Sequence, residues 1–229
     1  MTIDPSKLKE QDLNMKVLRF STITDLVTSE NGEEYVIEGY AILFEESTTI
    51  GNYFTESIAR GAVSDDALED VLFFVNHDSN KITLARSRKN NENSSLQLKV
   101  DDKGLYFRTV LDVKNNPDAA ALYSAIKRND VDGMSFWMRV QKDEWDDLQS
   151  EMPKRKIIKI SKIFEISAVN WPAYENTEIY ARQVSDSLDN EKKALESARS
   201  ALLVNNDSLE LAKRKALFEI QKNQGGFKV

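Results

Sequence analysis

The chain has 229 residues, 41% of them hydrophobic, with 31 basic against 38 acidic residues. That hydrophobic share supports a sizeable core and argues against disorder throughout. Basic and acidic residues are interleaved and the formal net charge is −7, which argues against nucleic acid as a partner. The absence of cysteine excludes disulfides, thiolate metal sites and a cysteine nucleophile.

The beginning of the chain is polar and includes Pro5, which predicts a flexible leader over residues 1–15. It lacks the apolar stretch of a signal peptide. The longest purely apolar run, Val71 to Val75, is far shorter than the roughly 18 residues that a membrane span needs. We therefore expect a soluble, intracellular protein that makes no membrane contact.

Short segments in which apolar and polar residues alternate fill the next part of the chain, for example residues 35–44 and 96–100. This period of two predicts strands. The turn-forming residues 101–104 lie between 96–100 and 105–111, which predicts a hairpin. Antiparallel structure is the simplest interpretation, and we expect one β-dominated α+β domain over residues 16–184.

One helix is predicted inside this domain. Asn116 is a good cap, Pro117 suits the first helical position, and Asp118 places an acidic group in the first turn. The apolar spacing that follows extends the helix to Arg128. Asn129 suits the left-handed position that ends a helix.

The composition changes again over residues 185–229, where dense charges surround leucines spaced seven residues apart. This predicts a helical tail in two segments, with a break at 205–207 and a second helix over 208–221. A coiled coil and an amphipathic helix folded onto its own domain both fit the spacing. The leucines are Leu188, Leu195, Leu202 and Leu209.

Three polar islands interrupt apolar strands, and each carries a reactive side chain. His77 is the only histidine, so acid–base chemistry near neutral pH depends on it or on a strongly shifted carboxylate or lysine. Ser135 follows Gly133 and points away from the apolar face of its strand. Glu165 lies in a strand that otherwise looks buried, so its carboxylate needs a partner.

Each island also has an ordinary structural interpretation. A lone histidine is often satisfied or solvated, and a Gly-x-Ser is often turn chemistry. Glu165 could form an ion pair with Lys162 or Arg86. A metal-dependent hydrolase lacks ligands, since one histidine and no cysteine leave only carboxylates without a recognisable loop, and we expect no metal or cofactor.

Between Lys16 and Arg182 the chain contains many short motifs in a characteristic order. They are Gly39–Phe44, Glu56–Val63, Asn76–Asp78, Leu84–Ser87, Gly104–Leu105, Gly133–Phe136, Glu165–Val169 and Pro172–Tyr174. In these motifs the chain resembles the prohead serine proteases of tailed bacteriophages, distant relatives of the herpesvirus assemblins. Two positions depart from that family, which usually has glycine where Ala85 and Trp137 stand.

The resemblance implies a closed or nearly closed antiparallel β-barrel with peripheral helices, and a serine endopeptidase. It makes Ser135 the nucleophile and His77 the general base. The herpesvirus relatives orient their base with a second histidine, which this chain lacks, so a carboxylate must replace it. Glu165 matches the acidic position of the family, and Asp78 is the local rival.

The resemblance also implies the partners. The substrate is the scaffolding portion of the major capsid protein precursor, together with the ends of the protease itself, and copies self-associate inside the prohead. The place of action is the assembling prohead in the cytoplasm of the infected bacterial host. The tail either is removed by self-cleavage or docks onto the scaffold. A non-catalytic phage structural or scaffold component with the same barrel is the alternative function.

Overall fold

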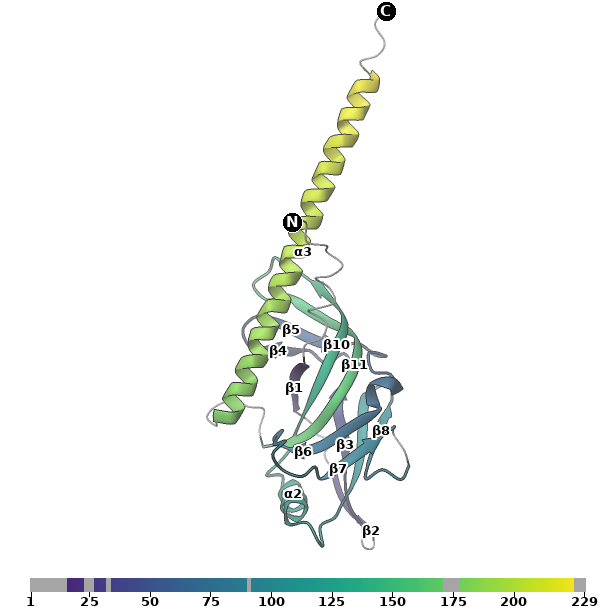
Figure 1. Ribbon diagram of the computed structural model, residues 1–229, viewed down its shortest axis with the longest axis vertical. Coiled ribbons are helices and arrows are strands. Elements are labelled where there is room, and N and C mark those ends of the chain that lie inside the picture. Colours follow the sequence, from purple (N-terminus) through teal and green to yellow (C-terminus); the bar gives the residue numbers. More distant parts are fainter. Residues whose placement is uncertain (1–15, 23–26, 32–33, 90–91, 171–177, 225–229) are drawn as a thin grey trace, which may run out of the picture.

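The computed structural model describes residues 16–22, 27–31, 34–89, 92–170 and 178–224. Two β-sheets and few helices form the domain, and a long helix, α3 (Glu178–Gln224), projects from one end of it (Figure 1). This arrangement confirms a strand-dominated α+β fold. The leader predicted over 1–15 lies outside the described residues.

The larger sheet has seven strands and the smaller sheet has four. The larger sheet has the order β1 (Lys16–Thr22), β10 (Gly133–Asp146), β11 (Lys154–Val169), β5 (Phe54–Ile58) and β4 (Thr48–Ile50). Off this path, β6 (Asp70–Val75) pairs with β11 and with β7 (Ala85–Arg88). The smaller sheet has the order β2 (Val27–Asn31), β3 (Glu34–Leu43), β9 (Gly104–Leu111) and β8 (Leu96–Val100).

The expectation of a closed barrel is not confirmed, because no strand pair among the described residues joins the two sheets. Strand β7 of the larger sheet lies near β8 of the smaller sheet, but side chains take the place of backbone hydrogen bonds between them. The backbone N–H groups of Arg86 and Arg88 donate to the hydroxyls of Ser95 and Ser94, at 3.0 and 3.2 Å. Amides that are satisfied by side chains cannot extend a sheet across this seam.

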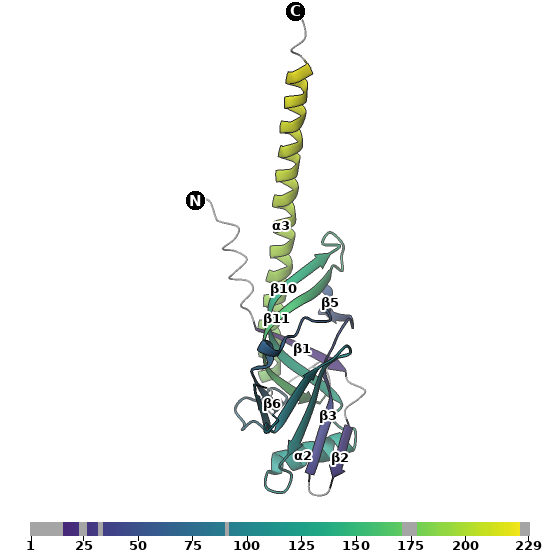
Figure 2. The same cartoon turned by 90° about the vertical axis from the view of Figure 1, so that its right-hand side faces the viewer.

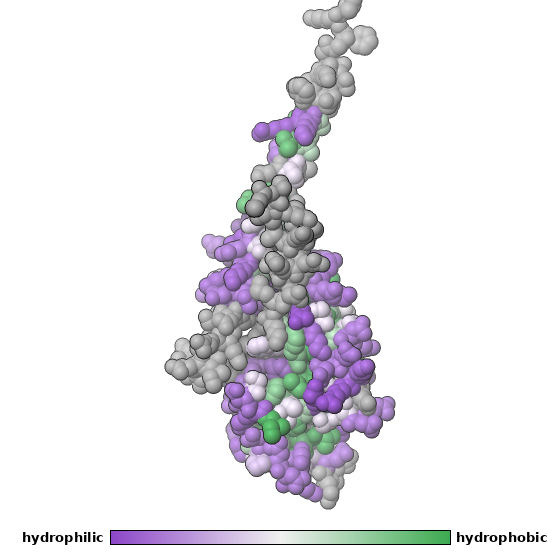
Figure 3. Space-filling model, in the orientation of Figure 1, coloured by the Kyte–Doolittle hydropathy of each residue, from purple (hydrophilic) through white to green (hydrophobic). Residues whose placement is uncertain are grey.

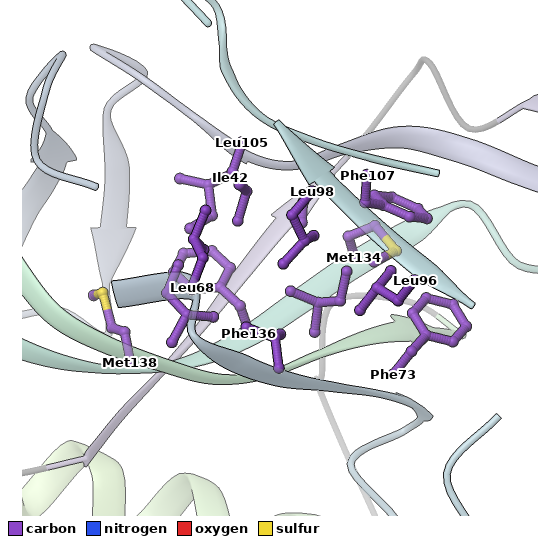
Figure 4. Close-up of a cluster of buried hydrophobic side chains, with 14 of the residues drawn as sticks. Ile42, Leu68, Phe73, Leu96, Leu98, Leu105, Phe107, Met134, Phe136 and Met138 are labelled. Carbon is purple, nitrogen blue, oxygen red and sulfur yellow. The ribbon is translucent and has the colours of Figure 1, made fainter. Parts of the chain in front are cut away.

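The core lies between the two sheets and draws side chains from both (Figure 4). Phe73 of β6 and Phe107 of β9 are fully buried, with ring centroids 5.8 Å apart. Met134 of β10 is also fully buried in this cluster. Burying such side chains stabilises each by about 1.5–3 kcal/mol, so the sheets are held face to face mainly by apolar contact.

The larger sheet is mixed, and the expectation of purely antiparallel structure is wrong there. Lys154–Ile157 of β11 pair in parallel with Thr55–Ile58 of β5, and Glu165–Ala168 pair in parallel with Leu72–Val75 of β6. A parallel pair needs a crossover connection, which the many elements between β6 and β11 supply. With 16 residues, β11 is long enough to hold a different partner at each end.

The predicted hairpin is present, with β8 and β9 antiparallel and Val100 opposite Leu105. Gly104 is required for close packing at its turn. A Cβ atom there would lie 1.9 Å from the carbonyl oxygen of Ile42 on the neighbouring strand.

The predicted helix is also present as α2 (Pro117–Lys127). The Asn116 side chain caps it by accepting the backbone N–H groups of Asp118 and Ala119, at 3.0 and 3.4 Å. Asn129 adopts φ 59°, the left-handed conformation predicted for the helix end. A short 3-10 helix, η1 (Asp65–Leu68), precedes β6.

The tail is one continuous helix, so the predicted break at 205–207 is wrong. No glycine or proline occurs between residues 178 and 224. Asparagine and aspartate each cost at most about 0.7 kcal/mol relative to alanine inside a helix, which strong helix formers on both sides outweigh. The boundary predicted between 184 and 185 falls inside this helix.

A buried ionic cluster, formed by Arg19, Glu56, Arg155 and Glu191, fastens α3 to the larger sheet. Arg19 Nη2 donates to Glu191 and to Glu56, at 2.8 and 2.6 Å, and Arg19 Nε also donates to Glu56. Arg155 Nη1 donates to Glu191 and Glu56 at 2.8 and 3.1 Å. All four residues are buried, so each charge depends on its partners for the solvation that water would otherwise give.

Beyond this cluster α3 docks for two more turns and then leaves the domain. Leu195 packs against Ile50 and Phe54. Arg199 donates to the carbonyl oxygens of Leu148 and Ser150. Of the predicted leucine series, Leu195 therefore supports a helix folded onto its own domain, while Leu188 and Leu209 have no described side chains.

The projecting part of α3 exposes apolar side chains. Leu203 and Val204 are each 63% exposed, and Leu211 and Leu217 are also exposed. Figure 3 shows hydrophobic patches beside hydrophilic ones along this segment. Within the part of the chain that the structure describes, no helix is both long and apolar enough to cross a membrane.

Replacing Glu191 by glutamine is expected to destabilise the protein. The variant removes a carboxylate that both buried guanidinium groups share, and it leaves Glu56 for both and the partly exposed Asp143 for Arg155 alone. We expect this loss of charged hydrogen bonds to cost about 1.5–3 kcal/mol in the free energy of unfolding. Urea unfolding measures the loss. Glu196→Gln, an exposed change on the same helix, is the matched control and should stay within about 0.5 kcal/mol of wild type. Equal effects of the two variants would contradict a structural role for the cluster.

Acid is expected to weaken the same cluster. Burial alone would raise the pKa of Glu56, but the guanidinium groups of Arg19 and Arg155 outweigh it and hold that pKa below the ordinary 4.5. The cluster's contribution is therefore fully present above pH 4.5 and is lost as the pH falls below this value. Unfolding measured across this range should show a shallower pH slope in Glu56→Gln than in wild type. Identical slopes would show that another group controls acid unfolding.

Candidate active site

The structure brings the three predicted site residues into one hydrogen-bonded group. His77 Nε2 lies 2.6 Å from Ser135 Oγ. On the other side of the ring, His77 Nδ1 contacts Glu165 Oε1. Ser135, His77 and Glu165 are 0%, 4% and 8% exposed, so the group is enclosed by protein.

The register of β10 and β11 explains how two of these residues meet. Ser135 is directly opposite Ser167, and Trp137 is directly opposite Glu165. Residues that face each other across an antiparallel pair project to the same side of the sheet. Ser135 and Glu165 therefore share one face, although 29 residues of chain lie between them.

His77 reaches the same face because the chain turns sharply after β6. Asn76 and His77 adopt φ 51° and 55°, two successive left-handed residues. Such conformations are uncommon for side chains other than glycine and persist only where the surroundings hold them. They give the imidazole an orientation that a continued strand would not.

Backbone contacts with the end of β11 hold this turn. The N–H of Asn76 donates to the Ala168 carbonyl at 2.9 Å, and the N–H of His77 donates to Ser167 Oγ at 3.3 Å. The N–H of Asn170 donates to Asn76 Oδ1 at 3.2 Å. The turn therefore continues the parallel pairing of β6 with β11, and the position of His77 depends on that pairing.

Glu165 has partners other than the ion-pair partners considered from the sequence. Its carboxylate contacts His77 and Ser167, whereas Arg86 forms a bidentate pair with Asp70 at 2.7 and 2.6 Å. The interpretation of Glu165 as the partner of Arg86 is therefore wrong. No contact between Glu165 and Lys162 occurs among the described hydrogen bonds and ion pairs.

Asp78, the rival carboxylate, is turned toward its own loop. Its Oδ1 accepts the N–H of Asn80 at 3.1 Å. The left-handed turn at His77 directs the imidazole toward β11, where Glu165 and not Asp78 meets Nδ1. The geometry favours Glu165 as the group that orients the ring.

Ser135 has a second contact that sequence reasoning missed. Its hydroxyl donates to the backbone carbonyl of Arg19 on β1, at 2.6 Å. A hydroxyl carries one hydrogen, so in this arrangement the hydrogen that points to Arg19 is not shared with His77 Nε2. Rotation about the Cβ–Oγ bond would turn this hydrogen from the Arg19 carbonyl toward His77 Nε2.

A model of the family described as caudovirus prohead serine protease matches residues 23–193. The chain belongs to this family. It is 27% identical, over 176 residues, to the prohead protease of Enterobacteria phage HK97, covering 76% of this chain and 72% of the relative. Its fold also aligns with the bacteriophage T4 capsid assembly protease gp21, with a TM-score of 0.37 and 15% identity, over 69% of this chain and 100% of that one.

Membership in this family makes the protein a serine peptidase of the assembling prohead. Family membership therefore favours a protease over the alternative function, a non-catalytic structural or scaffold component with the same fold. Trp137, noted above as a departure from the resemblance, lies next to the imidazole, with ring centroids 6.4 Å apart. Ala85, the other departure, is buried and is paired with Phe73 of β6.

Proposed function

We propose that this prohead protease cleaves peptide bonds with Ser135 as nucleophile, His77 as general base and Glu165 as the carboxylate that orients the base. The observation that carries the proposal is the 2.6 Å contact between His77 Nε2 and Ser135 Oγ, with Glu165 on the opposite ring nitrogen. A base within this distance can take the hydroxyl proton as the hydroxyl attacks.

The acylation step follows from these positions. Ser135 Oγ attacks the scissile carbonyl carbon, and its proton passes to His77 Nε2 as the oxygen–carbon bond forms. Glu165 accepts the Nδ1–H, fixes the tautomer and stabilises the imidazolium. The imidazolium then gives its proton to the leaving nitrogen as the carbon–nitrogen bond breaks. Water repeats the sequence on the acyl-enzyme and restores Ser135.

Substrate must first gain access to the nucleophile. Ser135 has no exposed surface, and its hydroxyl is bonded to the Arg19 carbonyl. A bound peptide must therefore displace the atoms that cover Ser135, and the hydroxyl must turn from Arg19 toward His77 before attack.

We assign as substrates the scaffolding portion of the major capsid protein precursor and the ends of the protease itself. The family's place in prohead maturation supports the first, and the extended α3 supports the second, because half of this helix stands clear of the domain (Figure 2). The exposed apolar residues Leu203, Val204 and Leu211 support contacts with the scaffold or with a second copy inside the prohead.

Ser135→Ala and His77→Ala are expected to abolish cleavage of co-expressed capsid precursor, by four orders of magnitude or more in rate, about the loss seen when a triad member is removed. Mass spectrometry of the precursor and of the protease chain measures cleavage and self-cleavage together. Ser161→Ala, on β11 but bonded only to the Arg139 carbonyl at 3.2 Å, is the control and should cleave normally. Processing at the wild-type rate by both site variants would refute the assignment.

Glu165→Gln is expected to lower kcat by about three to four orders of magnitude while the protein stays folded. A neutral amide cannot stabilise the imidazolium and permits the wrong tautomer. Asp78→Asn keeps the loop acceptor for Asn80 and is the matched control, expected to retain wild-type kcat. The reverse result, a large loss in Asp78→Asn and none in Glu165→Gln, would transfer the orienting role to Asp78.

A further inference from the structure

Ser167 lies at the centre of the site and within the motif Glu165–Val169, but the proposed mechanism gives it no role. It is fully buried, directly opposite Ser135 across the β10–β11 pair. It is also two residues beyond Glu165 on the same strand, so the two side chains project to one face. This spacing is the sequence signal that could have identified it.

The Ser167 hydroxyl joins the carboxylate and the histidine. It donates to Glu165 Oε2 at 2.7 Å and accepts the backbone N–H of His77 at 3.3 Å. Its single hydrogen is therefore committed to the carboxylate, and one lone pair to the main chain of the base. No other described hydrogen bond links the two residues through a third side chain.

The two carboxylate oxygens of Glu165 are divided between two partners. Oε1 contacts His77 Nδ1, and Oε2 accepts the Ser167 hydroxyl. A carboxylate held at both oxygens is restrained from rotating about its terminal bond. Without the hydroxyl, Oε2 would be a buried oxygen without a donor, and the carboxylate would turn to find one.

We propose that Ser167 is a positioning residue of this protease, which fixes the Glu165 carboxylate and the main chain of His77 so that the imidazole faces Ser135. The inference rests on the proposed function of these three residues. Ser167 acts through Glu165 and His77 and does not touch the substrate. Its hydroxyl is hydrogen-bonded both to the turn after β6 and to the Glu165 carboxylate on β11, so it links the positions of the two.

The test uses two readouts on the full chain. Ser167→Ala is expected to lower kcat about ten- to a hundredfold with KM unchanged, the usual loss when an outer partner of a site residue is removed. NMR reads the ring directly, since the chain has one histidine. The His77 Nδ1 proton should exchange faster with solvent in Ser167→Ala than in wild type. Ser167→Cys, which retains a weak donor, should lie between them in both readouts.

Ser161→Ala is the matched control, because it removes a serine hydroxyl from the same strand away from the imidazole. It should leave kcat and the His77 signals unchanged. The proposal is overturned if Ser167→Ala keeps kcat within twofold of wild type, or if kcat falls while the His77 signals stay those of wild type. The NMR readout needs no cleavage, so it fails or succeeds separately from the proposed function, which fails if Ser135→Ala retains activity.

Discussion

The whole site depends on β11, the strand that pairs with both β10 and β6. Its antiparallel register with β10 sets Ser135 opposite Ser167, and its parallel register with β6 brings the chain to His77 beside the same residues. Backbone ladders fix both registers, because a shift of one residue would turn every side chain to the other face. Three segments far apart in the chain therefore meet through a single strand.

Local features of this fold could be predicted from the sequence because their causes are local. The cap, proline and acidic residue at 116–118 act within one turn of α2, and residues 101–104 join the two strands of their own hairpin. The choice of His77 also needed no structure, because the chain contains no other imidazole. Alternation along β10 placed Ser135 on the polar face without knowledge of its partner strand.

Features that depend on distant residues could not be predicted in the same way. The parallel pairing of β6 with β11 joins segments about ninety residues apart, and no local pattern distinguishes it from antiparallel pairing. The left-handed turn at Asn76 and His77 exists because β11 supplies its hydrogen bonds. The break expected in α3 is absent for the opposite reason, because the helix formers on both sides outweigh the local preference of asparagine and aspartate for turns.

Arg19 connects the anchor of α3 with Ser135, the proposed nucleophile. Its side chain binds Glu56 and Glu191, while its backbone carbonyl accepts the hydroxyl of Ser135. The ionic cluster therefore sets the position of β1, and β1 in turn lies against Ser135 through the β1–β10 ladder, in which Phe20 is opposite Ser135. Because a buried guanidinium tolerates little displacement from its carboxylates, the position of the carbonyl that holds the Ser135 hydroxyl is tied to the docking of the C-terminal helix. The docking of α3 and the geometry of the proposed nucleophile are thus coupled through Arg19.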